Sequence, residues 1–159
     1  MKKGFTLIEL LIVLVIVAVL VTVSVPKYKV AMEKTRGMEA VTNMKMLGDY
    51  LNARYVVQGN TYCPLNNCSL DKLRAYTNDL DLLHSTYFSV PALSSLSANE
   101  VTARTSRNSS GKAYTIMLRA RNGTDTVLCC SGDAVSCKAL GGEAGSGVCT
   151  ASDGLELKM

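Results

Sequence analysis

The sequence predicts an α+β protein in which one long N-terminal helix packs against a small antiparallel sheet. Three observations support this fold class: apolar residues dominate 5–25, apolar residues then recur at helical spacing to about position 58, and apolar and polar residues alternate after position 112. All six cysteines follow position 62, so we expect a disulfide-stabilised loop region near the C-terminus. The expected organisation is a helix over about 5–58 followed by a globular head over 59–159.

Residues 5–25 are long and apolar enough for a transmembrane helix. At about 1.5 Å per residue they span roughly 32 Å, which matches the hydrocarbon core of a bilayer. A cleaved secretory signal has a shorter apolar core and a small-residue cleavage site, and neither feature is present before Pro26. Glu9 is the one charged residue in 5–25, and an unpaired charge inside a membrane costs about 3 kcal/mol. Glu9 is therefore a candidate functional residue, although it also lies close enough to the N-terminus to reach the membrane surface.

The first eleven residues, MKKGFTLIELL, resemble the signature of type IV prepilins. That signature is a short basic leader that ends in glycine, then a phenylalanine, then an apolar helix with a glutamate five residues into the mature chain. Pro26 and Tyr28 also lie where pilins often have proline and tyrosine. The resemblance implies that a prepilin peptidase removes the leader 1–4 by cutting between Gly4 and Phe5, and that the new Phe5 amine is methylated.

The resemblance also implies a structural function without catalysis or a cofactor. The precursor is expected in the bacterial inner membrane, and the assembly machinery then adds it to a homo-oligomeric extracellular pilus filament. In that filament Glu9 is expected to pair with the methylated Phe5 amine of a neighbouring subunit. Two alternatives stay open: a pseudopilin of a type II secretion system, and a minor pilin that binds DNA or a surface.

The segment 26–58 is expected to continue the helix with one apolar face. Pro26 should loosen the helix without ending it, and Gly59-Asn60 supplies a stop. Apolar residues recur three to four positions apart at Val30, Met38, Val41, Met44, Leu47, Leu51 and Tyr55.

The head is expected to contain a short helix and several strands. Leucine spacing predicts a helix over 69–84. Residues 113–121 alternate as a half-buried strand does, Asn122-Gly123 is a hairpin turn signal, and 124–130 is the returning strand. Weaker strand signals lie at 86–90 and 100–104, and the serine-rich stretches 94–97 and 105–110 are expected to be loops.

The six cysteines of a small exported head predict three disulfides, for which 15 connectivities are possible. Cys129 and Cys130 are neighbours in a predicted strand, so their side chains point to opposite faces and need different partners. Cys63–Cys68 and Cys130–Cys137 are the shortest loops, which leaves Cys129–Cys149. The alternative, a zinc site, lacks a C-x-x-C pair, and His84 is the one histidine in the sequence.

Charge and motifs offer little for catalysis or for nucleic-acid binding. The formal charge is +4, but residues 59–159 hold nine basic and nine acidic residues. His84 has no evident nucleophile as a partner, and no catalytic residues are predicted. A possible basic face consists of Arg104, Arg107, Lys112, Arg119 and Arg121, but the zero net charge of the head favours a solvated outer face balanced by nearby acids.

The two signals for membrane orientation disagree. Four Lys or Arg residues lie within 27–36 and only Lys2 and Lys3 precede the apolar segment, so the positive-inside rule alone would place the head in the cytoplasm. Six cysteines are typical of an oxidising compartment. The cysteines and the prepilin signature together favour a head outside the cytoplasm.

Overall fold

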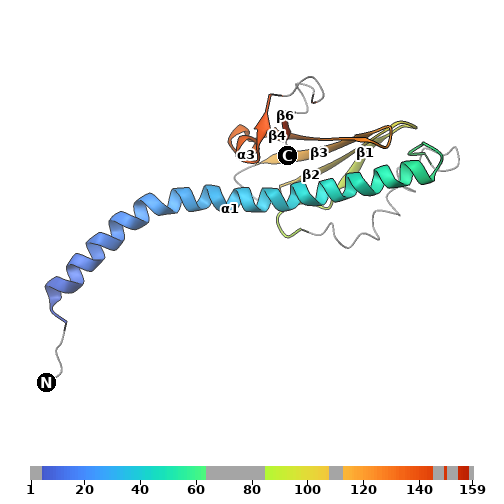
Figure 1. The fold of residues 1–159 in the computed structure, drawn as a ribbon. Coiled ribbons are helices and arrows are strands. Elements are labelled where there is room, and N and C mark those ends of the chain that lie inside the picture. The colour runs from blue at the N-terminus through green and yellow to red at the C-terminus, as the bar shows by residue number, and fades with distance from the viewer. Residues whose placement is uncertain (1–4, 64–84, 108–112, 145–148, 150–153, 158–159) are drawn as a thin grey trace. The chain divides into compact units, whose positions relative to one another are not determined.

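The computed structural model describes residues 5–63, 85–107, 113–144, 149 and 154–157. The chain divides into two compact units, Met1–Glu33 and Lys34–Met159. Helix α1 (Leu7–Val57) supplies the described structure of the first unit and continues as the first element of the second (Figure 1). The predicted helix and its end are therefore confirmed, and Pro26 lies inside the helix without ending it.

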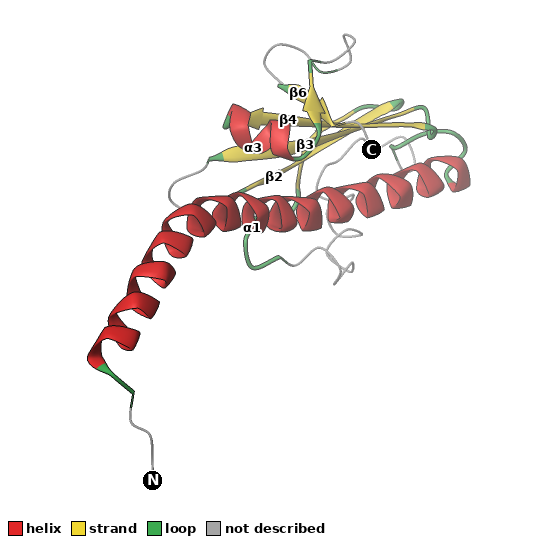
Figure 2. Ribbon diagram, turned by 60° about the vertical axis from the view of Figure 1, so that its left-hand side comes forward, coloured by secondary structure: helices red, strands yellow, loops and turns green. Residues whose placement is uncertain are grey.

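The second unit is a helix packed on one antiparallel sheet, which confirms the predicted fold class (Figure 2). The strand order is β1-β2-β3-β4-β6-β5, and each neighbouring pair is antiparallel. The elements after α1 are β1 (Ala92–Leu96), β2 (Glu100–Ser106), β3 (Tyr114–Arg121), β4 (Asp125–Gly132), α3 (Ala134–Ala139), β5 (Gly142–Glu143) and β6 (Leu155–Leu157).

The core of the second unit lies between α1 and the sheet. On β3 the predicted apolar face, which includes Ile116 and Leu118, is buried. On α1 the buried side chains recur at the helical spacing that the sequence predicts, and they share one apolar cluster with those of the sheet. The helix contributes Ala40, Val41, Met44, Leu47, Leu51 and Tyr55 to this cluster.

Gly48 lets α1 approach the sheet closely. A Cβ atom built on it would lie 2.7 Å from Thr126 Cγ2 and 3.1 Å from Leu118 Cδ1. The glycine costs about 1 kcal/mol of helix propensity relative to alanine, but it removes the atom that would push the sheet away. Gly37 has the same function against the Leu140 side chain.

The turn after α1 uses two residues with left-handed backbone. Gly59 has φ 81° and Asn60 has φ 61°, the conformation that glycine and asparagine tolerate best. The Asn60 amide donates to the Tyr55 carbonyl at 2.9 Å and so satisfies one of the last carbonyls of the helix.

Two predictions for the segment before β2 are wrong. The serine-rich stretch 94–97 was expected to be a loop, but Ser94 and Ser95 lie in β1. Their hydroxyls hydrogen-bond to Thr102 Oγ1 at 2.7 and 2.9 Å, and β1 is an edge strand with an irregularity between Leu93 and Ser95, so polar residues are tolerated there. The residues 86–90 were expected to form a strand, yet within them the sheet pairing is one isolated bridge, from Phe88 to Arg107.

The other predicted strands are present, and the C-terminal region contains more regular structure than the sequence predicts. The strand over 100–104 is confirmed and extends to Ser106, inside a stretch that was expected to be a loop. The strands around the Asn122-Gly123 hairpin are confirmed. The C-terminal region contains α3, β5 and β6 in addition to loop, and Asp133 caps α3 by accepting from the Ser136 amide at 3.0 Å. The predicted helix over 69–84 lies outside the described residues.

Replacing Gly48 by valine is expected to lower the free energy of unfolding by about 2 kcal/mol, because the added atoms overpack the contact with Thr126 and Leu118. The matched control is Ala53→Val, on an exposed position of the same helix, which should cost only roughly 0.5 kcal/mol of helix propensity. Urea unfolding of the full-length chain in detergent, followed by circular dichroism, measures both. Equal losses for the two variants would show that the close approach at Gly48 is unimportant.

Candidate assembly segment and disulfide-bonded head

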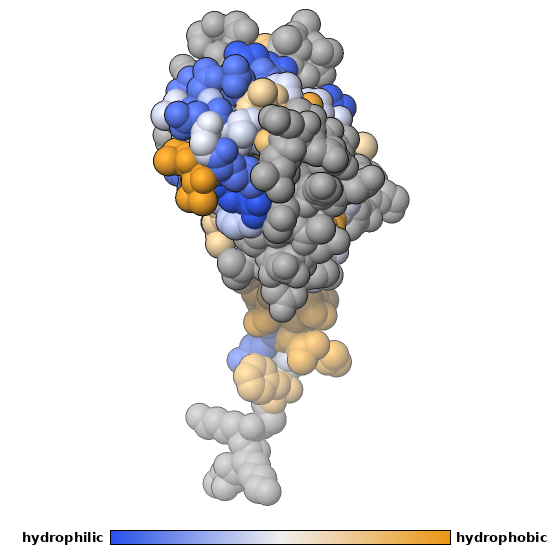
Figure 3. All heavy atoms as spheres, turned by 90° about the vertical axis from the view of Figure 1, so that its right-hand side faces the viewer, coloured by the Kyte–Doolittle hydropathy of each residue, from blue (hydrophilic) through white to orange (hydrophobic). Residues whose placement is uncertain are grey.

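The apolar part of α1 in the first unit has no cover. Every described residue from Phe5 to Ala31 is exposed, and Phe5 and Leu7 expose 85% and 91% of their surface. Among the described residues α1 is the helix that is long and apolar enough to cross a membrane. Figure 3 shows hydrophobic residues gathered on the N-terminal part of the helix, whereas hydrophilic residues prevail among the described residues of the head on the face in view. Such a surface requires lipid or other protein around it.

Glu9 lies in a capping box at the start of α1. The Thr6 amide and the Thr6 hydroxyl both donate to Glu9 Oε2, at 2.9 and 2.8 Å. In return the Glu9 amide donates to Thr6 Oγ1 at 3.3 Å. The two side chains thus satisfy backbone groups that the first helical turn leaves unpaired.

The capping box is a function of Glu9 that the sequence analysis missed. Its signal was readable, because Thr6-Leu7-Ile8-Glu9 has the Ser/Thr-x-x-Glu spacing of such a box. The Glu9 carboxylate lies beside the backbone of Thr6, the residue that follows Phe5. Phe5 is described and exposed, while Gly4, on the other side of the predicted cleavage point, lies outside the described residues.

The side chains of the adjacent cysteines of β4 point to opposite faces of the sheet. Cys130 is bonded to Cys137 of α3, with a Cα–Cα distance of 5.5 Å, and this bond lies in the core shared with α1. Cys129 is bonded to Cys149 with a Cα–Cα distance of 5.9 Å, and this bond lies on the other face, against Met117. Both pairs are those expected from the alternation of a strand and from loop length. Cys63 is also disulfide-bonded, and its expected partner Cys68 lies outside the described residues.

The outer face of the sheet carries mixed charge. Arg119 and Arg121 both meet Glu100, with Nε–Oε distances of 3.3 and 2.7 Å. Arg107 turns away to stack against Tyr87, whose carbonyl accepts from its Nη1 at 2.9 Å. By strand register, three basic and four acidic residues share this face: Arg104, Arg119, Arg121, Glu100, Asp125, Glu143 and Glu156.

The described part of the sheet therefore has the charge-balanced outer face that the net charge of the head favours, and the possible basic face does not form. Glu100 compensates two of its arginines, and Arg107 is engaged elsewhere. Lys112, the remaining member, lies outside the described residues. A mixed-charge face lacks the clustered positive charge on which phosphate-backbone binding depends.

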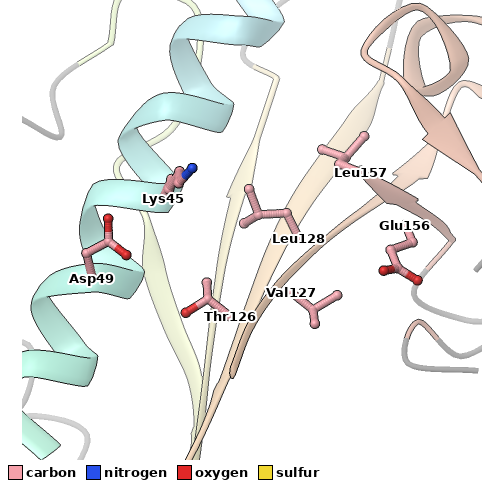
Figure 4. Close-up of a pocket in the computed structure, with 7 residues that line it drawn as sticks. All are labelled: Lys45, Asp49, Thr126, Val127, Leu128, Glu156 and Leu157. Atoms are coloured by element: carbon pink, nitrogen blue, oxygen red, sulfur yellow. The ribbon is translucent and has the colours of Figure 1, made fainter. Parts of the chain in front are cut away.

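A hollow of about 240 Å³ lies between α1 and the β4 side of the sheet (Figure 4). Lys45 and Asp49 reach it from the helix, and Glu156 comes from β6. No histidine, cysteine or serine is among its described lining residues. Among the described residues, no group of three or more His, Cys, Asp or Glu side chains is placed to hold a metal ion. The lining residues are Lys45, Asp49, Thr126, Val127, Leu128, Glu156 and Leu157.

Removal of either disulfide is expected to destabilise the head, and more so for the bond that closes the longer loop. The Cys129→Ala/Cys149→Ala variant should lose about 3 kcal/mol and the Cys130→Ala/Cys137→Ala variant about 2 kcal/mol, because closing a longer loop restricts the unfolded chain more. Urea unfolding of both double variants under non-reducing conditions measures the difference. Midpoints equal to that of the unmodified chain would contradict a stabilising function for these bonds.

Comparison with known proteins identifies the N-terminal segment. No curated protein and no solved structure matches the chain. Residues 1–25 match the family model described as the prokaryotic N-terminal methylation motif. The match covers residues 1–4, Phe5, the Thr6–Glu9 capping box and the exposed apolar part of α1 as far as Val25. The chain therefore carries the N-terminal segment that is characteristic of type IV pilin and prepilin-like proteins, which are structural proteins and generally not enzymes.

Proposed function

We propose that the chain is a structural subunit of an extracellular type IV pilus filament. The observation that carries this proposal is a methylation motif that runs directly into an apolar helical segment with every described residue exposed from Phe5 to Ala31. In the precursor the inner membrane covers this surface. In the filament the helices of neighbouring subunits cover it instead.

Cleavage and methylation of the N-terminus prepare the helix for its move from the membrane into the filament. Prepilin peptidase cuts between Gly4 and Phe5, and the amine of Phe5 is methylated. Cleavage removes Lys2 and Lys3, whose two charges would otherwise have to enter the apolar filament core. The new N-terminus then begins with an apolar residue and carries a single positive charge.

Glu9 sets the register of the incoming subunit. In an apolar bundle an unpaired carboxylate is strongly unfavourable, and an opposite charge at contact distance compensates it. The methylated Phe5 amine of a neighbour supplies that charge. A subunit offset along the bundle would leave both charges unpaired, so the pair favours one axial position.

The disulfides and the charge of the head support a filament subunit over a DNA-binding minor pilin. The Cys129–Cys149 and Cys130–Cys137 bonds suit an oxidising exterior. A DNA-binding minor pilin finds no support in the charge-compensated outer face of the sheet. A pseudopilin of a type II secretion system shares the N-terminal motif, and assays of secretion and of surface filaments separate the two.

The charge of Glu9 can be separated from its capping function. Glu9→Gln keeps a side-chain oxygen at the third helical position, where glutamine also forms capping boxes, but it removes the charge. Thr6→Val removes the capping hydroxyl and keeps the charge. We expect Glu9→Gln subunits to be cleaved at Gly4 and to remain in the membrane, with at least a tenfold loss from the sheared filament fraction. Thr6→Val subunits should assemble nearly normally.

Immunoblots of membrane and sheared fractions, with N-terminal mass analysis, give the readout. Normal assembly of Glu9→Gln together with failed assembly of Thr6→Val would assign Glu9 to helix capping alone. It would thereby overturn the pairing with the Phe5 amine.

A further inference from the structure

The hairpin between β3 and β4 contains the single Asn-Gly pair of the sequence. Asn122 has φ 51° and Gly123 has φ 72°, so both residues adopt the left-handed conformation of a tight turn. The Asn122 side chain is exposed to solvent. Asparagine before glycine is chemically labile, because glycine has no side chain to hinder attack by its own backbone nitrogen.

The reaction of such a pair is a self-modification of the backbone. The Gly123 nitrogen attacks Cγ of Asn122, a nitrogen–carbon bond forms, and the side-chain amide leaves as ammonia. The product is a five-membered succinimide, which one water molecule opens to aspartate or to isoaspartate. Isoaspartate lengthens the main chain by one methylene, and both products add a carboxylate next to a turn that already carries Asp125.

The fold requires the glycine that makes this pair labile. A Cβ atom at position 123 would run into the Tyr55 ring, with Cγ at 3.0 Å and Cε1 at 3.1 Å. The positive φ of Gly123 disfavours other residues as well. The lability therefore cannot be removed by substituting the glycine without losing the contact between the hairpin and the helix.

The attacking nitrogen is held by a buried tyrosine. The Gly123 amide donates to the Tyr62 hydroxyl at 3.0 Å, and that hydroxyl donates to Asn52 Oδ1 at 2.8 Å. Asn52 in turn donates from Nδ2 to Thr126 Oγ1 at 2.8 Å. Tyr62 is 1% exposed, and its ring lies 4.6 Å from that of Tyr55, so the hydroxyl is fixed in place.

Burial also keeps this hydroxyl protonated. Desolvation raises the pKa of Tyr62 above its ordinary value, even though the hydrogen bond from Gly123 lowers it. In mildly alkaline solution, where succinimide formation is fastest, Tyr62 therefore remains neutral and keeps its hydrogen bond to Asn52 as well as the one from Gly123.

We propose that Asn122-Gly123 is a site of spontaneous backbone modification and that the Tyr62 hydroxyl suppresses the reaction by holding the Gly123 nitrogen away from Asn122 Cγ. The hydrogen bond occupies the N–H that must be lost before attack, and it fixes the peptide plane of the turn. Modification would also disturb the hydrogen bond from the Asn122 amide to the Asn99 carbonyl, which is 3.0 Å long. The turn would then lose its contact with the connection between β1 and β2.

The test compares the full-length chain in detergent with its Tyr62→Phe variant during incubation in mildly alkaline buffer. Phenylalanine keeps the ring contact with Tyr55 and removes the hydroxyl. Peptide mass mapping and an isoaspartate assay follow the peptide that contains Asn122. We expect modification to be roughly fivefold faster in the variant, which corresponds to about 1 kcal/mol at 1.4 kcal/mol per factor of ten.

Three controls separate the hydrogen bond from general unfolding. Tyr87→Phe removes the hydroxyl of a tyrosine far from the turn, and Ile116→Val weakens the core without contacting the turn. In both variants Asn122 should therefore be modified at the wild-type rate. In concentrated urea the chain and its Tyr62→Phe variant should modify at the same rate. Equal rates of Asn122 modification in the folded wild-type chain and in the folded Tyr62→Phe variant would overturn the proposal. A rate in Ile116→Val as high as in Tyr62→Phe, or a difference that persists in urea, would overturn it as well.

Discussion

The apolar surface of α1 needs cover along its whole length, and the rest of the structure follows from how that cover is supplied. In the second unit the sheet supplies it, and the helix residues from Ala40 to Tyr55 that face the sheet are buried. In the first unit the described residues through Ala31 are all exposed. Exposure of apolar surface to water costs about 25 cal/mol per Å², so leaving a segment of this length uncovered in water is strongly unfavourable. A membrane and a bundle of neighbouring helices are two environments that cover such a surface, and in the proposed function the segment moves from the first to the second.

The head is organised to cover its part of the helix closely. Gly48 removes the side chain that would separate helix and sheet, so the two layers meet closely. The adjacent cysteines of β4 then brace the sheet on both faces, one bond in the core and the other against Met117. At the far end of α1 the buried Tyr62 ties the chain that leaves the helix to the β3–β4 hairpin. Covalent and hydrogen-bonded connections therefore supplement a core that a head of this size builds only in part.

The elements with a strong periodic signal were predictable, and those that depend on distant contacts were not. The helix, the hairpin strands and the disulfide pairs of β4 follow from spacing alone, because 3.6-residue and 2-residue periods report directly on which side chains are buried. The edge strand β1 was missed because its serines are satisfied by Thr102, a contact that local composition does not reveal. The equal numbers of acids and bases in the head already favoured a charge-balanced outer face, whereas the register that brings Glu100 against two arginines appears only when the strands pair. At the N-terminus, Glu9 was predictable as a functional residue, whereas its capping partner Thr6 was overlooked although its spacing was visible.

The central claim, that the exposed helical segment is covered by other copies of this chain in a surface filament, is tested most directly by electron microscopy of sheared cell-surface material. Wild-type cells and cells that lack this chain are compared, and the N-terminal mass of the filament subunit is determined. The account predicts filaments that disappear in the deletion strain and that contain this chain with methylated Phe5 as its first residue. Unchanged filaments without this chain would contradict it.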